Sequence, residues 1–121
     1  NLNVMKEKIT VYEKPTCTTC RIVKKELIAK GVEFEAINYF EQPLTAELLK
    51  KLLKAAGLKP TEAIRTKEEA YKQHVADKNL SDDQLIALMV KHPELIQRPI
   101  VVKGGKAVIP RPVEKLRELG L

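Results

Sequence analysis

The first 40 residues show two kinds of hydrophobic pattern in turn. Lys8–Tyr12 alternates apolar and polar positions and is rich in β-branched residues, which predicts a short strand. Apolar residues then recur at helical spacing up to Gly31, a typical C-terminal cap, at Ile22, Val23, Leu27 and Ile28. Val32, Phe34 and Ala36 alternate again and predict a second strand. A strand, a helix and a strand over about 30 residues form a βαβ unit, whose crossover makes the strands parallel.

The pattern is helical throughout residues 41–97. Thr45 is placed to cap a helix that closes at Gly57, and its apolar stripe consists of Leu48, Leu49, Leu52, Leu53 and Ala56. Thr61–Arg65 is typical of a short helix. Two further helices are predicted behind capping boxes at Thr66–Glu69 and Ser81–Gln84.

The last quarter of the chain returns to strands. Ile100–Val102 and Ala107–Ile109 are short strands joined through Gly104–Gly105, which favours a hairpin. Pro112 opens a final helix whose inward positions are Val113, Leu116 and Leu119. The order βαβ, helices, ββα resembles an α/β thioredoxin-like fold, a mixed sheet with an inserted helical sub-domain.

A length of 121 residues is usual for one domain, so we expect a single domain over 1–121. Its thioredoxin-like core takes about 8–40 and 98–121, and its helical insertion about 41–97.

The composition and charge indicate which classes of partner the protein can bind. No apolar run approaches the roughly 20 residues that span a bilayer, and Asn1–Lys6 lacks the apolar stretch of a secretion signal, so we expect a cytoplasmic protein without membrane contact. The formal charge is +6, but most Lys lie in mixed-sign helical stretches. No basic stripe is interleaved with aromatic residues, so direct nucleic-acid binding is not indicated. A positive excess suits a small anionic substrate.

The cysteine pair Cys17-Thr18-Thr19-Cys20 lies where the first strand gives way to the helix. A thiolate at Cys17 would face the free N–H groups of the first helical turn, and Arg21 adds positive charge nearby, so its pKa should be lowered. Cys20 falls on the same helix face, at a Cα separation of roughly 5–6 Å that permits a disulfide. One cysteine can attack and the other can resolve the adduct. The alternative is two unconnected core cysteines.

We expect neither a metal nor a bound cofactor. Two cysteines are too few for a four-cysteine zinc site, and His74 and His92 lie too far apart along the chain for a recognisable ligand spacing.

Three of the five arginines occupy distinctive positions. Arg65 ends the short helix, Arg98 precedes Pro99 and a strand, and Arg111 lies between two prolines. A guanidinium fork binds two oxygens of a tetrahedral oxyanion at once and stays charged. Each arginine taken singly is typical of a surface residue, but the set opposite a thiolate predicts an anion site.

Four segments together resemble the glutaredoxin-type arsenate reductase family and its Spx-like relatives, over about residues 9–119. They are Tyr12–Arg21 (YEKPTCTTCR), Asn38–Leu44 (NYFEQPL), Ala63–Lys67 (AIRTK) and His92–Val102 (HPELIQRPIVV). The resemblance implies that Cys17 is the catalytic cysteine. It also implies that arsenate or a similar oxyanion is held by Arg65, Arg98 and Arg111. The thiolate attacks arsenate, a thiol reductant (glutathione with glutaredoxin, or thioredoxin) reduces the adduct, and arsenite leaves. Pro99 takes the place of the cis proline that faces the active cysteine in thioredoxin-like domains.

Two residues depart from the family pattern. Glu13 stands where well-studied members have His, and an anion there would oppose the thiolate. Cys20 stands where many have Ser, which favours an internal disulfide recycled by thioredoxin or glutaredoxin. Two alternatives to arsenate reduction remain: an Spx-like regulator that binds RNA polymerase through a redox switch, and a general dithiol–disulfide oxidoreductase.

Overall fold

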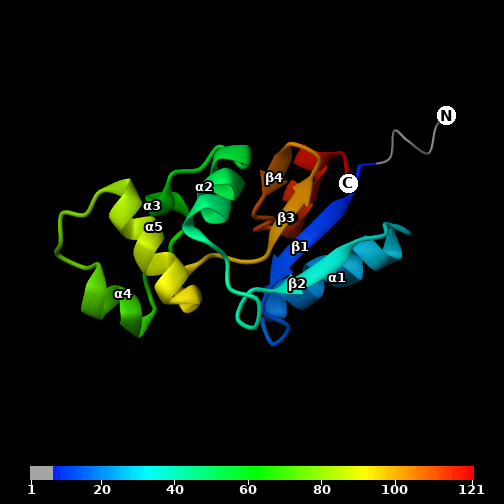
Figure 1. Cartoon of the computed structure of the whole chain (residues 1–121). Helices are drawn as coiled ribbons and strands as arrows, with labels where there is room; N and C mark the ends of the chain where they lie inside the picture. Colours follow the sequence, from blue (N-terminus) through cyan, green and yellow to red (C-terminus); the bar gives the residue numbers. More distant parts are fainter. Residues whose placement is uncertain (1–6) are drawn as a thin grey trace. The chain divides into compact units, whose positions relative to one another are not determined.

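The computed structural model describes residues 7–121 (Figure 1). Asn1–Lys6, on which the expectation about secretion rested, lies outside the described residues. The described chain divides into two compact units, residues 7–38 with 98–121 and residues 39–97.

The first unit is built on a mixed sheet whose strands, within the described residues, lie in the order β2-β1-β3-β4. The strands are β1 (Ile9–Glu13), β2 (Glu35–Asn38), β3 (Ile100–Lys103) and β4 (Lys106–Val108). β1 pairs with β2 in parallel, with β3 antiparallel to β1 and β4 antiparallel to β3. The predicted βαβ unit, hairpin and mixed-sheet fold class are therefore confirmed.

The second strand begins later than its alternation predicted. Val32 N–H donates to Leu27 O at 3.0 Å, and Gly31 has a φ of +71°, so these two residues close the preceding helix. This is the arrangement in which a left-handed glycine is followed by an apolar residue that packs back on the helix. Val32 and Phe34 pack against the core before the ladder begins at Glu35.

Helix α1 (Thr18–Ala29) covers the sheet with one narrow face (Figure 1). Val23 and Leu27 are fully buried in the core, with Ile9, Val11, Val101, Val108, Leu116 and Leu119. Ile22 and Ile28 are instead 49% and 68% exposed. Successive helical residues are turned by about 100°, so the neighbours of Val23 and Leu27 point off the buried face. Of the four apolar residues that predicted this helix, only Val23 and Leu27 therefore belong to the core.

The chain ends in a 3₁₀ helix, η3 (Val113–Leu119), behind Pro112. Leu116 and Leu119 are buried and Val113 packs beside them. Their spacing of three residues matches the three-residue turn of a 3₁₀ helix, which stands where the sequence predicted the final helix. The Arg98–Pro99 peptide bond is cis, as the layout predicted, and Arg111–Pro112 is also cis.

The second unit is helical. Its helices are α2 (Ala46–Ala55), α3 (Pro60–Ala63), α4 (Glu69–His74), α5 (Asp82–Lys91) and the 3₁₀ turn η2 (Pro93–Leu95). The Thr45 side chain caps α2 by accepting from Leu48 N–H at 3.0 Å. Ser81 and Gln84 cap α5 reciprocally, as predicted.

Two predictions about this unit were wrong. The helix expected over Thr61–Arg65 ends at Ala63, because Ile64 pairs with Ile96 in an isolated bridge. The capping box at Thr66–Glu69 does not form, and α4 begins only at Glu69. Glu68 takes the N-cap position, and its carboxylate accepts from Arg65 Nε at 3.1 Å and gives no side-chain cap to the helix.

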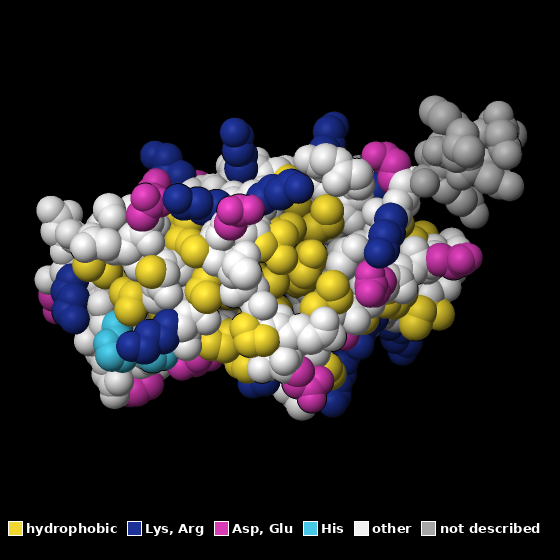
Figure 2. Space-filling model, viewed as in Figure 1, with side chains coloured by type: hydrophobic (Ala, Val, Ile, Leu, Met, Phe, Trp, Pro, Cys, Tyr) yellow, Lys and Arg dark blue, Asp and Glu magenta, His cyan; other side chains and the backbone are white. Residues whose placement is uncertain are grey.

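No described helix has the length and apolar character needed to cross a bilayer. On the face shown in Figure 2, Lys and Arg side chains are interspersed with Asp and Glu. This distribution agrees with mixed-sign, solvated helix faces.

Candidate functional site

A tight turn delivers Cys17 to the start of α1. Strand β1 ends at Glu13, and Cys17 N–H then donates to Lys14 O at 2.9 Å. Cys17 takes the N-cap position with extended backbone angles (φ −78°, ψ 127°). A helix leaves its first N–H groups without carbonyl partners, so those groups face the residue at the cap. The strand–turn–helix expected around the first cysteine is therefore present.

The environment of Cys17 favours its thiolate. Burial by itself raises the pKa of the thiol, but four hydrogen bonds outweigh it and leave the pKa below its ordinary value. They come from the Cys20 backbone N–H, the Cys20 thiol, the Arg98 side chain and the Thr19 backbone N–H. Hydrogen bonds to the charged form stabilise it, most strongly when the donor is itself charged. Cys17 is half-buried, so a small electrophile can reach it.

Cys20 has the opposite character. It is fully buried, and burial is the main cause that raises its pKa to about 12. A backbone hydrogen bond from Lys14 opposes this rise, whereas Cys17 and the charge of Glu13 add to it. Both thiols are free in this structure. Of the two, Cys17 has the lowered thiol pKa, which favours the nucleophilic thiolate form, and the Cys20 thiol is in hydrogen-bond contact with it.

The β3–β4 hairpin brings two of the predicted arginines together. Arg98 precedes β3 and Arg111 follows β4, and Val101 pairs with Val108 between them. Arg111 NH1 donates to the Arg98 carbonyl at 2.7 Å. Arg98 itself is only 6% exposed, and its side chain bonds Cys17. Cys17, Cys20, Arg98 and Arg111 therefore belong to one unit of the structure.

Arg65 belongs to the other unit. There its Nε bonds Glu68 at 3.1 Å and its NH1 lies 3.5 Å from Gln97 Oε1. Its expected part in an oxyanion site stays a prediction.

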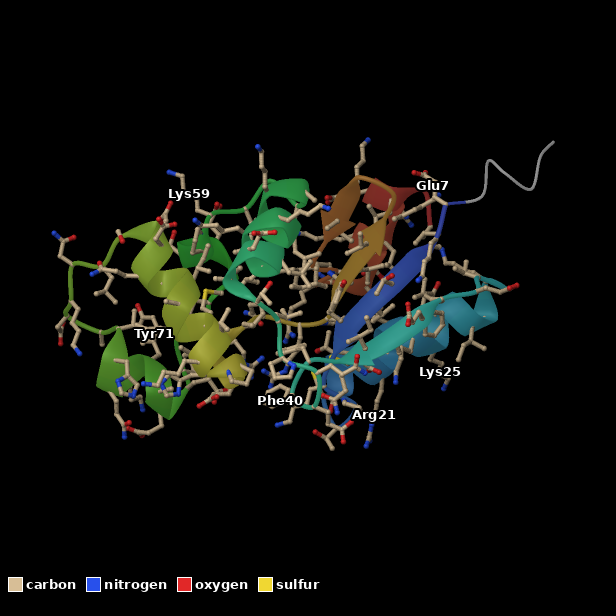
Figure 3. The ribbon with its side chains drawn as sticks, viewed as in Figure 1. Glu7, Arg21, Lys25, Phe40, Lys59 and Tyr71 are labelled. Carbon is tan, nitrogen blue, oxygen red and sulfur yellow. The ribbon has the colours of Figure 1, made fainter. Side chains whose placement is uncertain are left out.

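Arg21 supports the turn that carries Cys17. Its Nε donates to Pro15 O at 3.1 Å, and the side chain lies at the N-terminal end of α1 (Figure 3). A hydrogen bond across the Pro15–Thr16 turn helps to hold the loop before the N-cap.

Sequence reasoning missed the partner of Glu13. The carboxylate is 3% exposed, and its Oε2 accepts from Lys24 Nζ at 2.9 Å. Its charge raises the pKa of Cys20. The burial was readable from the pattern, because Ile9, Val11 and Glu13 alternate along β1 and all three are buried.

Replacing Lys24 with Ala is expected to lower the free energy of unfolding by about 1–3 kcal/mol, because it leaves a buried carboxylate without its charged donor. The Lys50–Asp83 pair, at 2.7 Å, is the matched control, since both its side chains are more than half exposed. Lys50→Ala should cost less than about 0.5 kcal/mol. Urea denaturation measures both values, and equal losses would contradict the buried-pair interpretation.

No cluster of three or more His, Cys, Asp or Glu suited to a metal occurs within residues 7–121. His74 and His92, distant in sequence, stack in the second unit with ring centroids 4.6 Å apart. The two histidines are therefore close in space although they lie 18 residues apart in the sequence.

Comparison with known proteins identifies the family. The model of the ArsC family matches residues 12–119. The uncharacterized protein YfgD of Escherichia coli K12 is 41% identical over 95% of this chain and 98% of its own length. An arsenate reductase of the same organism is 36% identical over 92% of this chain and 79% of its own. The structure titled arsenate reductase from Vibrio cholerae superposes with a TM-score of 0.88 and 38% identity, covering 93% of this chain and 98% of that one.

These relatives match almost the whole chain. The matched region contains the thioredoxin-like sheet and this chain's paired thiols at the start of α1. The chain belongs to the ArsC family, and it is a thiol-dependent oxidoreductase.

Proposed function

We propose that this protein reduces arsenate to arsenite at Cys17. The observation that carries the proposal is a half-buried thiol with a lowered pKa, hydrogen-bonded by the buried Arg98 side chain. A nucleophile next to a fixed guanidinium suits attack on an oxyanion, because the cation offsets the charge of the incoming substrate. The relatives titled arsenate reductase support this choice of substrate.

The proposed chemistry has two steps. The Cys17 thiolate attacks arsenic and displaces a hydroxyl group as water, which gives an S–As bond. Cys20 then attacks the Cys17 sulfur, an S–S bond forms, and the S–As electron pair stays on arsenic as arsenite departs. An external thiol reductant, thioredoxin or glutaredoxin with glutathione, reduces the disulfide. Thiol reductants abound in the cytoplasm, where we place this cycle.

In this proposal the arginines hold the arsenate oxygens. Arg98 faces Cys17, and Arg111 uses one of five N–H donors on the Arg98 carbonyl, which leaves a fork for an anion. Arg65 is the predicted third member.

The test is turnover of arsenate measured beside turnover of a small aromatic disulfide, each with thioredoxin and with glutaredoxin plus glutathione. Arsenate turnover well above a Cys17→Ser control supports the proposal. Disulfide turnover with no arsenate turnover would overturn it in favour of a second candidate, a general dithiol–disulfide oxidoreductase. The contact between a low-pKa and a high-pKa thiol favours that candidate too.

A further inference from the structure

We propose that the Glu13 carboxylate is the proton acceptor that activates Cys20 for the resolving step. The inference rests on the proposed role of Cys20 as the resolving thiol. It applies to any adduct on Cys17, whether arsenate or a disulfide forms it.

The first support is the position of Glu13. It is the last residue of β1 and lies on the buried face of that strand. Lys24, which donates to its Oε2, is one helical turn after Cys20 on α1. Residues four apart share a helix face, so the carboxylate lies beneath the face that carries Cys20. No charged group other than Lys24 bonds this carboxylate within residues 7–121.

The second support is an unused acceptor. Oε2 takes the Lys24 hydrogen bond, but Oε1 is buried and has no hydrogen-bond partner in the described part of the chain. A buried oxygen without a donor is costly, and native proteins keep few of them. Lys24 binds one oxygen of the carboxylate, and the other can receive a proton without breaking that bond. In the resting structure the Cys20 thiol donates to Cys17 and not to this oxygen, so the transfer belongs to the state in which Cys17 carries an adduct.

The third support is the need for a base. At pH 7 a thiol with a pKa of about 12 is a thiolate in only about one molecule in 10⁵. Cys20 is fully buried, so its proton has no direct path to bulk solvent in the resting structure. A base within the core would give this proton an acceptor at the moment the thiol attacks.

The proton balance closes over one cycle. Cys20 loses its proton to Glu13, its thiolate attacks the Cys17 sulfur, and the electron pair of the broken bond leaves with the departing group. An external dithiol then attacks the Cys17 sulfur of the disulfide. Cys20 departs as a thiolate and takes the proton back from Glu13.

A purely electrostatic role for Glu13 predicts the opposite effect of its removal. The negative charge raises the pKa of Cys20, so a charge-only Glu13 hinders resolution and Glu13→Gln would accelerate it. A proton acceptor hastens resolution, so the same substitution would slow it. The sign of the change therefore distinguishes the two roles.

The experiment uses 5,5′-dithiobis(2-nitrobenzoate) in stopped flow. Attack by Cys17 releases one thionitrobenzoate, and resolution by Cys20 releases the second. For Glu13→Gln we expect an unchanged first phase and a second phase slower by roughly 10- to 100-fold at pH 7. The deficit should shrink as the pH rises, because hydroxide replaces the missing base, whereas a structural defect would leave it constant. Glu26→Gln, at a partly exposed carboxylate of α1 that pairs with Lys30, should match wild type.

A second phase at the wild-type rate or faster in Glu13→Gln overturns the proposal. Glu13→Asp guards against misfolding of the Gln variant; its second phase should fall between the other two, and one at or above the wild-type rate overturns the proposal equally. Failure of the resolving role gives a different result, since wild type would then release a single thionitrobenzoate, as Cys20→Ser must. Arsenate turnover does not enter this assay.

Discussion

Replacing Cys17 with Ser is expected to lower arsenate turnover by at least about 10³-fold, because a serine hydroxyl is not ionised at neutral pH and forms no S–As bond. The loss should appear in kcat, since Arg98 and Arg111, the arginines of the proposed oxyanion site, remain in place. Coupled oxidation of NADPH through the reductant system measures it. Turnover of the Ser variant within a few-fold of wild type would remove Cys17 from the chemistry.

The matched variant is Cys20→Ser, three residues away on the same helix. Cys17 keeps most of its hydrogen bonds there, because the Cys20 and Thr19 backbone N–H groups and Arg98 are unchanged. A single turnover should therefore still form the S–As adduct, which mass spectrometry detects, while catalysis stops without a second thiol. Added glutathione should restore part of the turnover. Full activity of Cys20→Ser with thioredoxin alone would contradict its resolving role.

Much of the first unit was predictable, because its elements carry local signals. β1 alternates, the hairpin has Gly104–Gly105, and the crossover rule then makes the first two strands parallel. The start of β2 was not predictable from alternation. Val32 serves the end of α1 before the ladder begins, and a period of two residues does not distinguish a strand from such a closing segment.

Those parts of the site were predictable whose residues are brought together by a short turn or a hairpin. The pair Cys17 and Cys20 follows from one turn, and the approach of Arg98 to Arg111 follows from one hairpin. The partner of Glu13 depends on α1 packing over β1, a tertiary contact that no local pattern encodes. The same limit applies to Thr66–Glu69, where α4 begins behind Glu68 and the Glu68 side chain, bound to Arg65, gives no cap.

Glu13 acts differently on the two thiols. An anion in place of the family's His was expected to oppose the thiolate at Cys17. In the structure Lys24 offsets that charge, while Cys17 receives its own hydrogen bonds from the helix start and from Arg98. The pKa of Cys17 is lowered in spite of Glu13, and the carboxylate raises the pKa of Cys20.

The Arg98→Ala variant is expected to raise the pKa of Cys17, because it removes a charged hydrogen bond to the thiolate. Alkylation of Cys17 by iodoacetamide at neutral pH should then be slower, and its pH profile should shift to higher pH. Binding of arsenate or sulfate should weaken by about 10- to 100-fold, the usual cost of losing one charged hydrogen bond. Isothermal titration calorimetry and pH-dependent alkylation give the two readouts separately.

This variant is informative because it spares the neighbouring arginine. Arg111 bonds the backbone carbonyl of Arg98, and the Arg98→Ala variant keeps a carbonyl at that position. Arg111 therefore stays placed, and any loss of anion affinity belongs to the Arg98 side chain. Arg117→Ala, an exposed arginine of η3, controls for the general loss of one positive charge and should leave both readouts unchanged. If Arg98→Ala and Arg117→Ala bind the oxyanion equally well, Arg98 does not belong to the proposed anion site. Its role would then be limited to stabilising the Cys17 thiolate.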